Sequence, residues 1–215
     1  MGRPRQFETD AALELAMRVF WSKGYEATTL PDLLGAMRIS RGSFYKAFHD
    51  KRAVYLAALE RYNRTRVEET VTMLQSPGTG TGKERIESLF KALSERPDRS
   101  GCFLCNAAVD RAPHDPEIEG RVNAMVQRLE QGFRRALEGD RPDIEPYLLD
   151  EAAKSLVVSY LGLQVLDTAG LNAQMAESCR LQVKRMLEAA VGEGKTAQRS
   201  AATAVNANPS GNDSA

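Results

Sequence analysis

A short basic segment contains the side chains best suited to chemistry, and it begins at Arg41 with the residues RGSFYKAF. An arginine can donate two hydrogen bonds to O6 and N7 of guanine, and a serine hydroxyl can donate to a base edge or a phosphate. Arg41 and Ser43 supply these two groups, and Gly42 between them leaves space for close approach to a duplex. The segment therefore predicts contacts to the bases of double-stranded DNA.

Residues around this segment are suited to the phosphate backbone. Tyr45, Lys46 and Lys51 supply a phenol and two ammonium groups, and Lys51 begins a predicted helix, where backbone amides and the helix dipole favour an anion. Near the N-terminus, Arg3 and Arg5 belong to a basic, proline-stiffened arm that can enter a minor groove. A disordered terminus that carries two arginines is an equally good interpretation of this arm.

Helical periodicity positions these residues. Apolar residues at i, i+3, i+4 and i+7 predict one helix behind a Thr9 cap and a second from Leu30 to Met37, capped by Thr29. Ser40 can cap a short third helix. Two short helices joined by a tight turn form a helix-turn-helix, which lays its second helix in the major groove. The alternative, a polar face that is merely solvated, does not explain why so short a helix is basic on one side.

The rest of the chain shows the same helical spacing, without the alternation typical of strands. Asp50 can cap a long fourth helix, and later helices are predicted over residues 86–93, 102–111, 116–133, 146–168 and 171–191. We therefore expect an all-α fold, with an N-terminal arm and helix-turn-helix DNA-binding domain in residues 1–52. Residues 53–191 form the effector-binding and dimerisation domain, and residues 192–215, which have almost no large apolar group, form a disordered tail.

Charge is divided unevenly along a chain whose net charge is zero. Residues 1–52 carry nine Lys or Arg and six Asp or Glu, a net charge of +3, so the remaining residues carry 20 minus 23, or −3. A cationic head on an acidic body confines the attraction for DNA to the head. Because no apolar run reaches about 18 residues and no apolar N-terminal signal is present, we expect a cytoplasmic protein without a membrane span.

Other reactive residues are few. Two histidines without a nearby nucleophile or carboxylate pair indicate that the chain is not an enzyme, and the scattered ligand types predict neither a metal nor another cofactor. Cys102 and Cys105 lie at i and i+3 near a predicted helix start, where the dipole lowers a thiol pKa. They can form a disulfide or share an electrophile, although buried cysteines more often act as small hydrophobes.

From about residue 7 to 60 the sequence closely resembles the tetracycline-repressor (TetR) family of bacterial transcriptional regulators. The resemblance rests on Phe20, Gly24-Tyr25, Thr28-Thr29, Ile39-Ser40, Ser43-Phe44-Tyr45, Phe48 and Lys51-Arg52. It implies a regulator, most often a repressor, that binds a palindromic operator as a dimer and leaves the DNA when a small-molecule effector binds. Carried over by position, the DNA contacts are Thr29, Ser40, Arg41, Gly42, Ser43, Tyr45, Lys46 and Lys51. Arg38 replaces the glycine usual in the family, at a cost on the order of 1 kcal/mol, and can add a phosphate contact.

The body offers candidates for effector and dimer contacts. Asn106 and Asp110, at i and i+4 on an otherwise apolar helix, can orient a ligand, although bridging of helix ends is the more frequent role. Residues expected to line the same pocket, unless they are plain core, are Phe90, Phe103, Met125 and Phe133. Broad apolar faces on the last two helices predict a homodimer interface of Leu156, Tyr160, Leu163, Val183, Met186 and Leu187. A thiol switch through Cys102 and Cys105 is the alternative to control by a bound metabolite.

Overall fold

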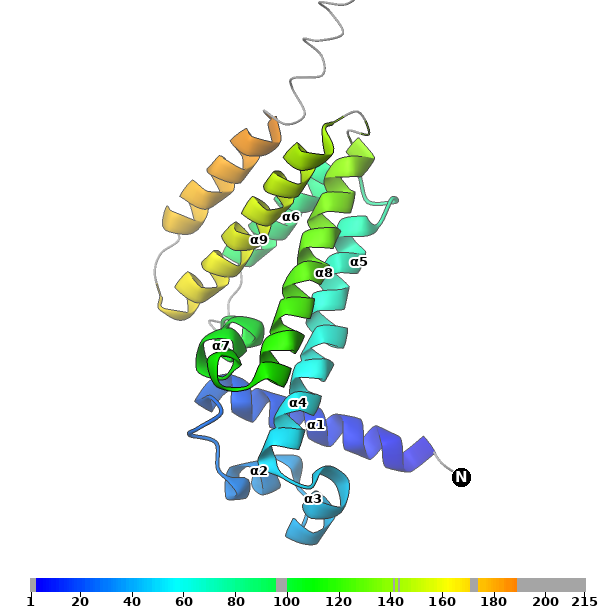
Figure 1. Ribbon diagram of the computed structural model, residues 1–215, viewed down its shortest axis with the longest axis vertical. Helices are drawn as coiled ribbons and strands as arrows, with labels where there is room; N and C mark the ends of the chain where they lie inside the picture. Colours follow the sequence, from blue (N-terminus) through cyan, green and yellow to red (C-terminus); the bar gives the residue numbers. More distant parts are fainter. Residues whose placement is uncertain (1–2, 96–99, 141, 143, 171–173, 189–215) are drawn as a thin grey trace, which may run out of the picture.

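The computed structural model describes residues 3–95, 100–140, 142, 144–170 and 174–188, and for residues 3–9 only the backbone. Helices and turns make up these residues, with no strand among them, so the all-α prediction is confirmed. Figure 1 shows a small helical head at one end of a long helical bundle. Every helix in the described part of the chain is too short or too polar to span a membrane. The predicted tail lies outside the described residues.

The head consists of α1 (Arg3–Lys23), α2 (Leu30–Met37) and α3 (Arg41–Phe48). Local capping fixes where the two short helices begin, as predicted. The Thr29 hydroxyl accepts a hydrogen bond from the Asp32 amide within a capping box, and the Ser40 hydroxyl accepts one from the Ser43 amide. The prediction that Thr9 caps the first helix is wrong, because α1 already begins at Arg3.

Two turns of the head hold non-glycine residues with a positive φ. Arg38 ends α2 with φ 56° and ψ 41°, which confirms the left-handed cap expected from the sequence. His49 follows α3 with φ 63°, which the sequence did not predict. Such a conformation costs on the order of 1 kcal/mol and persists only where the surrounding packing holds it. Met37, which directly precedes Arg38, is buried, as is Phe44 of α3, so both short helices are anchored in the core next to these turns.

A continuous helical path leads from the head into the body. It comprises α4 (Lys51–Tyr62), the π-helical segment η1 (Asn63–Val67) and α5 (Glu68–Gln75). Asp50 caps α4, as predicted, by accepting a hydrogen bond of 2.7 Å from the Ala53 amide. Within η1 the amide of Glu68 donates to the carbonyl of Asn63, five residues back. Such π segments are rare and frequently lie at functional sites.

The body is built from α6 (Gly82–Ser94), α7 (Phe103–Asp110), η2 (Ala112–His114), α8 (Pro116–Asp140), α9 (Pro146–Thr168) and a further helix over residues 174–188. α8 packs along α5, α6 and α9 (Figure 1). Its core side chains Leu129 and Phe133, with Ile86 and Phe90 of α6, are at most 2% exposed. Full burial of each such side chain stabilises the fold by about 1.5–3 kcal/mol.

An aromatic cluster fastens the head to the body. Tyr55 of α4 packs edge-on against Phe20 of α1 and Phe103 of α7, with ring centroids 5.0 and 5.5 Å away. Trp21 of α1 packs edge-on against Tyr62 at 5.3 Å. Aromatic pairs of this kind contribute about 0.5–1.5 kcal/mol each beyond their burial. The position of α7 is therefore tied directly to the two helices that support the helix-turn-helix.

Candidate functional site

The outer face of α3 carries the residues predicted to contact DNA. Arg41, Ser43, Tyr45 and Lys46 are exposed, whereas Phe44 on the inner face is fully buried. The helix therefore presents its donors away from the head, because Phe44 and the partly buried Phe48 anchor its inner face in the core.

Gly42 and Ser43 show how that face is kept open. A Cβ added at Gly42 would meet no heavy atom closer than Ser40 Oγ at 4.0 Å, so the fold itself does not require glycine there. The Ser43 and Ser40 hydroxyls lie 3.0 Å apart, and the Ser43 amide donates to Ser40 Oγ at 3.1 Å. The hydroxyls of Ser40 and Ser43 thus order the first turn of α3. Because Gly42 has no Cβ, this turn leaves room for a molecule to approach closely from outside the protein.

On the α2 side, Thr29 and Arg38 play different parts. The Thr29 hydroxyl donates to Asp32 Oδ2 at 2.8 Å, and Lys23 Nζ lies 2.7 Å from Asp32 Oδ1. The hydrogen bond from Lys23, followed by those from Thr29, holds the pKa of Asp32 well below its usual range. Thr29 is thus committed to capping, whereas the Arg38 side chain at the end of α2 is exposed.

Lys51, which was predicted to contact a DNA phosphate, has two partners within the head itself. Its Nζ donates to the carbonyl of Thr28 at 2.9 Å and lies 4.3 Å from the centroid of the Tyr25 ring. The ammonium group therefore ties the start of α4 to the loop between α1 and α2. This long-range role was missed in the sequence, where Lys51 was expected to contact the DNA backbone.

The predicted basic arm is helical at its start. The backbone of Arg3 and Arg5 lies in the first turn of α1, so a flexible arm is not what these residues form. Their side chains lie outside the described residues, and their contact with a minor groove stays a prediction.

Polar pairs from one short segment of the body clamp the head. The Tyr25 amide donates to Asp110 Oδ2 at 3.0 Å, and Asn106 Nδ2 donates to the Trp21 carbonyl at 3.3 Å. Asn106 and Asp110 therefore bridge helix ends, the alternative considered for them. Both also line an open pocket beside α7, so a role in orienting a ligand stays a prediction.

Two ion pairs strengthen the same junction. Arg111 pairs with Glu26 at 2.7 Å, and Arg52 makes two hydrogen bonds to Asp115, of 2.6 and 2.9 Å. The Arg52 guanidinium, with backbone amides of α8, lowers the pKa of Asp115 to about 2. Movement of the end of α7 would therefore displace the loop that precedes α2, and movement of the start of α8 would displace the start of α4.

The aromatic and Met candidates for the effector pocket belong to the core. Phe90, Phe103, Met125 and Phe133 are at most 3% exposed and pack with other buried side chains. None of them lines the cavity found nearby, which corrects the prediction that they form the pocket wall.

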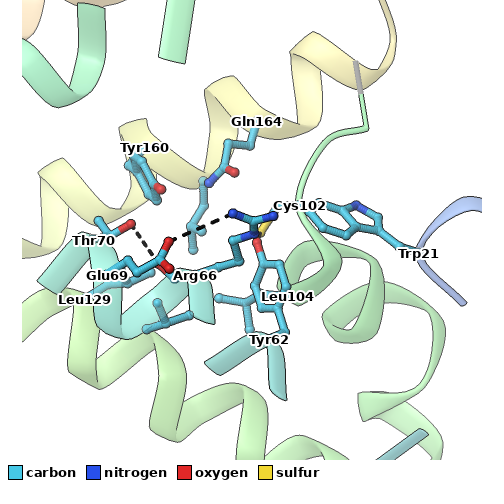
Figure 2. A pocket seen from close by; sticks show the side chains of 12 residues that line it. Trp21, Tyr62, Arg66, Glu69, Thr70, Cys102, Leu104, Leu129, Tyr160 and Gln164 are labelled. Atoms are coloured by element: carbon cyan, nitrogen blue, oxygen red, sulfur yellow. Dashed lines mark hydrogen bonds and ion pairs between the residues drawn. The ribbon is translucent and has the colours of Figure 1, made fainter. Parts of the chain in front are cut away.

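A cavity of about 190 Å³ lies instead where α1, α4, η1, α5, α7, α8 and α9 meet (Figure 2). Its lining residues are Trp21, Tyr62, Arg66, Val67, Glu69, Thr70, Cys102, Leu104, Leu129, Tyr160, Leu161 and Gln164. The sequence analysis missed this set because its residues come from seven elements. The one usable signal was a polar Gln164 within an apolar helix, and this residue is only 3% exposed.

Cys102 joins this cavity to the start of α7. Its sulfur lies 3.3 Å from the Tyr62 hydroxyl, and the residue is the N-cap of α7, as its predicted place near a helix start requires. Hydrogen bonds from the Cys105 thiol, from Tyr62 and from backbone amides lower the pKa of Cys102 to about 7, whereas that of Cys105 is raised. Both cysteines are free thiols.

The predicted dimer residues divide into two groups. Leu156, Leu163, Val183 and Leu187 are at most 7% exposed within the protomer, which corrects the prediction that they face a partner. Tyr160 and Met186 are partly buried against the same core. Large apolar side chains on the opposite faces of these helices are exposed instead, namely Val158, Val165, Met175 and Leu181.

Comparisons with known proteins match the helices of the head. The family model described as bacterial regulatory proteins, tetR family, matches residues 12–58, which lie in α1 to α4. The uncharacterized HTH-type transcriptional regulator YezE of Bacillus subtilis (strain 168) is 33% identical over 141 residues, covering 64% of this chain and 72% of YezE. The HTH-type transcriptional repressor ComR of Escherichia coli (strain K12) is 29% identical over 149 residues, covering 66% of this chain and 71% of ComR.

Solved structures extend the likeness to the body. The reduced form of E. coli NemR has the same fold, with a TM-score of 0.74 at 21% identity over 83% of this chain and 96% of NemR. A cysteine-substituted CifR, a TetR family transcriptional regulator bound to 26-bp operator DNA, gives a TM-score of 0.66 at 26% identity, covering 87% of this chain and 99% of CifR. With its helix-turn-helix, its helical body and these relatives, the chain belongs to the TetR family of bacterial DNA-binding transcriptional regulators.

Proposed function

We propose that this regulator is a repressor that binds a palindromic operator as a homodimer, with α3 of each protomer in the major groove. The observation that carries the proposal is the division of α3 into an exposed face with Arg41, Ser43 and Lys46 and a buried face with Phe44. A recognition helix needs this division, because its inner face must hold it rigidly while its first turn reaches base edges. Residues 1–52 then form the DNA-binding domain, and the protein acts in the cytoplasm.

Dimerisation is proposed through the outer faces of α9 and of the helix at 174–188. Val158 and Val165 lie seven residues apart on α9 and are 72% and 50% exposed, and Leu181 on the next helix is 40% exposed. Exposed apolar stripes on adjacent helices favour a self-complementary interface. A two-fold symmetric pair would place its recognition helices about one DNA turn apart, which is what a palindromic operator requires.

Control by a small molecule is proposed to start at the cavity beside η1. Cys102 and Leu104 line it from α7, and the opposite end of α7 holds the head through Asn106 and Asp110. An occupant that displaces α7 would therefore disturb the Tyr25 amide and the loop before α2. Such coupling requires only that the occupant bind the displaced form more tightly than the DNA-bound form.

The test of the proposed function is selection of duplexes from a randomised DNA library by the purified full-length chain. We expect a palindromic consensus in DNA retained by the wild type and no consensus in DNA retained by Arg41→Ala. A matched control, Arg64→Ala, changes an exposed arginine of η1 and should return the wild-type consensus. Failure of the wild type to enrich any sequence would refute the proposal.

A second candidate mode of control is a thiol switch, and the specific observation that favours it is the lowered pKa of Cys102, about 7, beside Cys105. Hydrogen peroxide would transfer one oxygen to the Cys102 thiolate with release of hydroxide, and Cys105 would displace the sulfenic hydroxyl as water to form a disulfide. The solved relatives include a reduced form of NemR and cysteine-substituted forms of CifR.

Oxidation separates the two modes of control. Loss of operator binding after peroxide treatment, abolished in Cys102→Ser and reversed by a dithiol, would support the switch. If peroxide does not change operator binding by the wild type, the thiol switch is excluded and control by a small molecule in the cavity is the mode that stands.

A further inference from the structure

The cavity beside η1 has the size of a single aromatic ring with a small substituent. Its volume is about 190 Å³, and a cavity of about 150 Å³ lined by apolar side chains holds benzene. Leu104, Leu129 and Leu161 supply apolar walls, and Trp21 and Tyr62 supply aromatic ones. These walls favour a flat ring over a bulky group at this part of the cavity, because apolar surface gains free energy when it leaves water.

Two hydrogen-bonding groups of the cavity wall are buried. Among the residues that the structure describes, the Trp21 indole nitrogen Nε1 has no hydrogen-bond partner, although it is shielded from solvent. An unpaired buried donor costs about 1–3 kcal/mol, and native structures contain few of them. The side-chain amide of Gln164, a residue only 3% exposed, extends from α9 into the same space (Figure 2). A ligand atom that accepts hydrogen bonds would satisfy the indole donor, which no described residue pairs.

Arg66 adds a positive charge at the mouth of the cavity. It belongs to the π-helical segment η1, and its side chain is half exposed. Its guanidinium lies 3.9 Å from Glu69, a long ion pair between exposed groups that contributes little free energy. Figure 2 shows this guanidinium extended toward the side of the cavity that Cys102 and Trp21 line. An arginine so weakly held can turn to a carboxylate, with which it forms two parallel hydrogen bonds.

We infer that the cavity binds a single-ring aromatic carboxylate, and that this class of compound is the effector. The ring lies against Tyr62, Leu104 and Leu129, and the carboxylate accepts hydrogen bonds from Arg66, Gln164 and Trp21. Glu69, the one carboxylate among the lining residues, disfavours a second negative charge, so the ligand is a monoanion. This inference rests on the proposed function, since only a DNA-binding regulator has an effector.

The experiment uses Trp21 as its own reporter, because it is the only tryptophan in the chain. Benzoate, benzamide and cyclohexanecarboxylate are titrated into the full-length protein while tryptophan emission is recorded, and thermal unfolding is measured at saturation. Benzoate should change the emission saturably and raise the melting temperature. Benzamide, which keeps the ring but lacks the charge, should bind about tenfold more weakly or worse, the loss expected for one charge-assisted hydrogen bond. Cyclohexanecarboxylate, which keeps the charge but lacks the flat ring, should also bind more weakly.

Two arginines of η1 give a matched pair of variants. Arg66→Gln should weaken benzoate binding about tenfold and leave benzamide binding unchanged. Arg64→Gln, which changes an exposed arginine that does not line the cavity, should leave both unchanged. Arg66→Lys keeps the charge and should retain most of the benzoate affinity, which shows that any loss in Arg66→Gln is not misfolding.

Three results would overturn the inference: no saturable change in Trp21 emission with benzoate, equal affinity for benzamide, or equal loss in the Arg64 and Arg66 variants. Operator binding is measured on the same samples. Specific operator binding that benzoate does not alter would refute the effector assignment while the DNA-binding function stands. Absence of any specific duplex would instead refute the proposed function, whatever the fluorescence shows.

Discussion

Replacing Lys51 with methionine tests whether this lysine stabilises the head or contacts DNA. Its ammonium group donates to the Thr28 carbonyl at 2.9 Å and lies 4.3 Å from the Tyr25 ring centroid. A hydrogen bond from a charged donor contributes about 1.5–3 kcal/mol, and a cation–π contact at a partly exposed site about 0.5–1 kcal/mol. Methionine keeps the apolar stem, and water partly screens the half-buried lysine, so we expect Lys51→Met to lower the free energy of unfolding by about 2 kcal/mol.

The assay is urea unfolding at equilibrium, with a titration of operator DNA at several salt concentrations. Lys46→Met is the matched control, because Lys46 is an exposed lysine on the outer face of α3. It should change stability by less than about 0.5 kcal/mol but reduce the salt dependence of DNA binding by about one counterion per protomer. If Lys51→Met keeps the wild-type urea midpoint and shows this reduced salt dependence itself, the assignment of Lys51 to the interior of the head is wrong.

Three further predictions concern the Arg52–Asp115 ion pair, the dimer interface and the hydrogen bond between Tyr25 and Asp110. Arg52 lowers the pKa of Asp115 to about 2, so the stabilisation by the Asp115 carboxylate is complete above the unfolded pKa of about 4 and is lost as the pH falls toward 2. Asp115→Asn should therefore reduce the loss of stability between pH 4 and pH 2, and an unchanged loss would contradict this. Val158→Glu should give monomers in sedimentation velocity without loss of helicity. The control Val109→Glu, at a position of α7 that is 81% exposed, should leave the dimer intact, and a dimeric Val158→Glu protein would exclude the proposed interface. Asp110→Ala, which leaves the Tyr25 amide without its acceptor, should cost about 1–3 kcal/mol in thermal or urea unfolding, and no measurable loss would show that this bridge does not hold the head.

Local features of the fold were predictable from the sequence. Thr29, Ser40 and Asp50 were identified as caps, and the structure confirms all three, because capping depends on a side chain and a backbone amide a few residues apart. The left-handed cap at Arg38 followed from the same local reasoning. The helix over residues 146–168 was also predicted with the bounds that the structure gives.

Features that depend on distant partners were not predictable in this way. The contacts of Lys51 within the head were missed because its partners, Thr28 and Tyr25, lie more than twenty residues away, and its contact with DNA stays a prediction. Leu156 and Leu163 were assigned to the dimer interface because α9 is apolar on two faces, and spacing alone does not say which face the protomer buries. The cavity was missed for a related reason, since Trp21, Arg66 and Gln164 come together only through packing of separate helices.

The central claim is that the first turn of α3 reads bases, and Arg41→Ala tests it most directly. The wild type and the variant are titrated against the selected operator and against duplexes changed at one base pair in each half-site. We expect the wild type to lose about 1–3 kcal/mol of binding free energy on one of these base changes, and Arg41→Ala to bind the original and that altered duplex equally. Its melting temperature should match the wild type, because the Arg41 side chain is exposed. An Arg41→Ala protein that binds every duplex more weakly but keeps the wild-type preference at each base pair would show that α3 does not read the operator through Arg41.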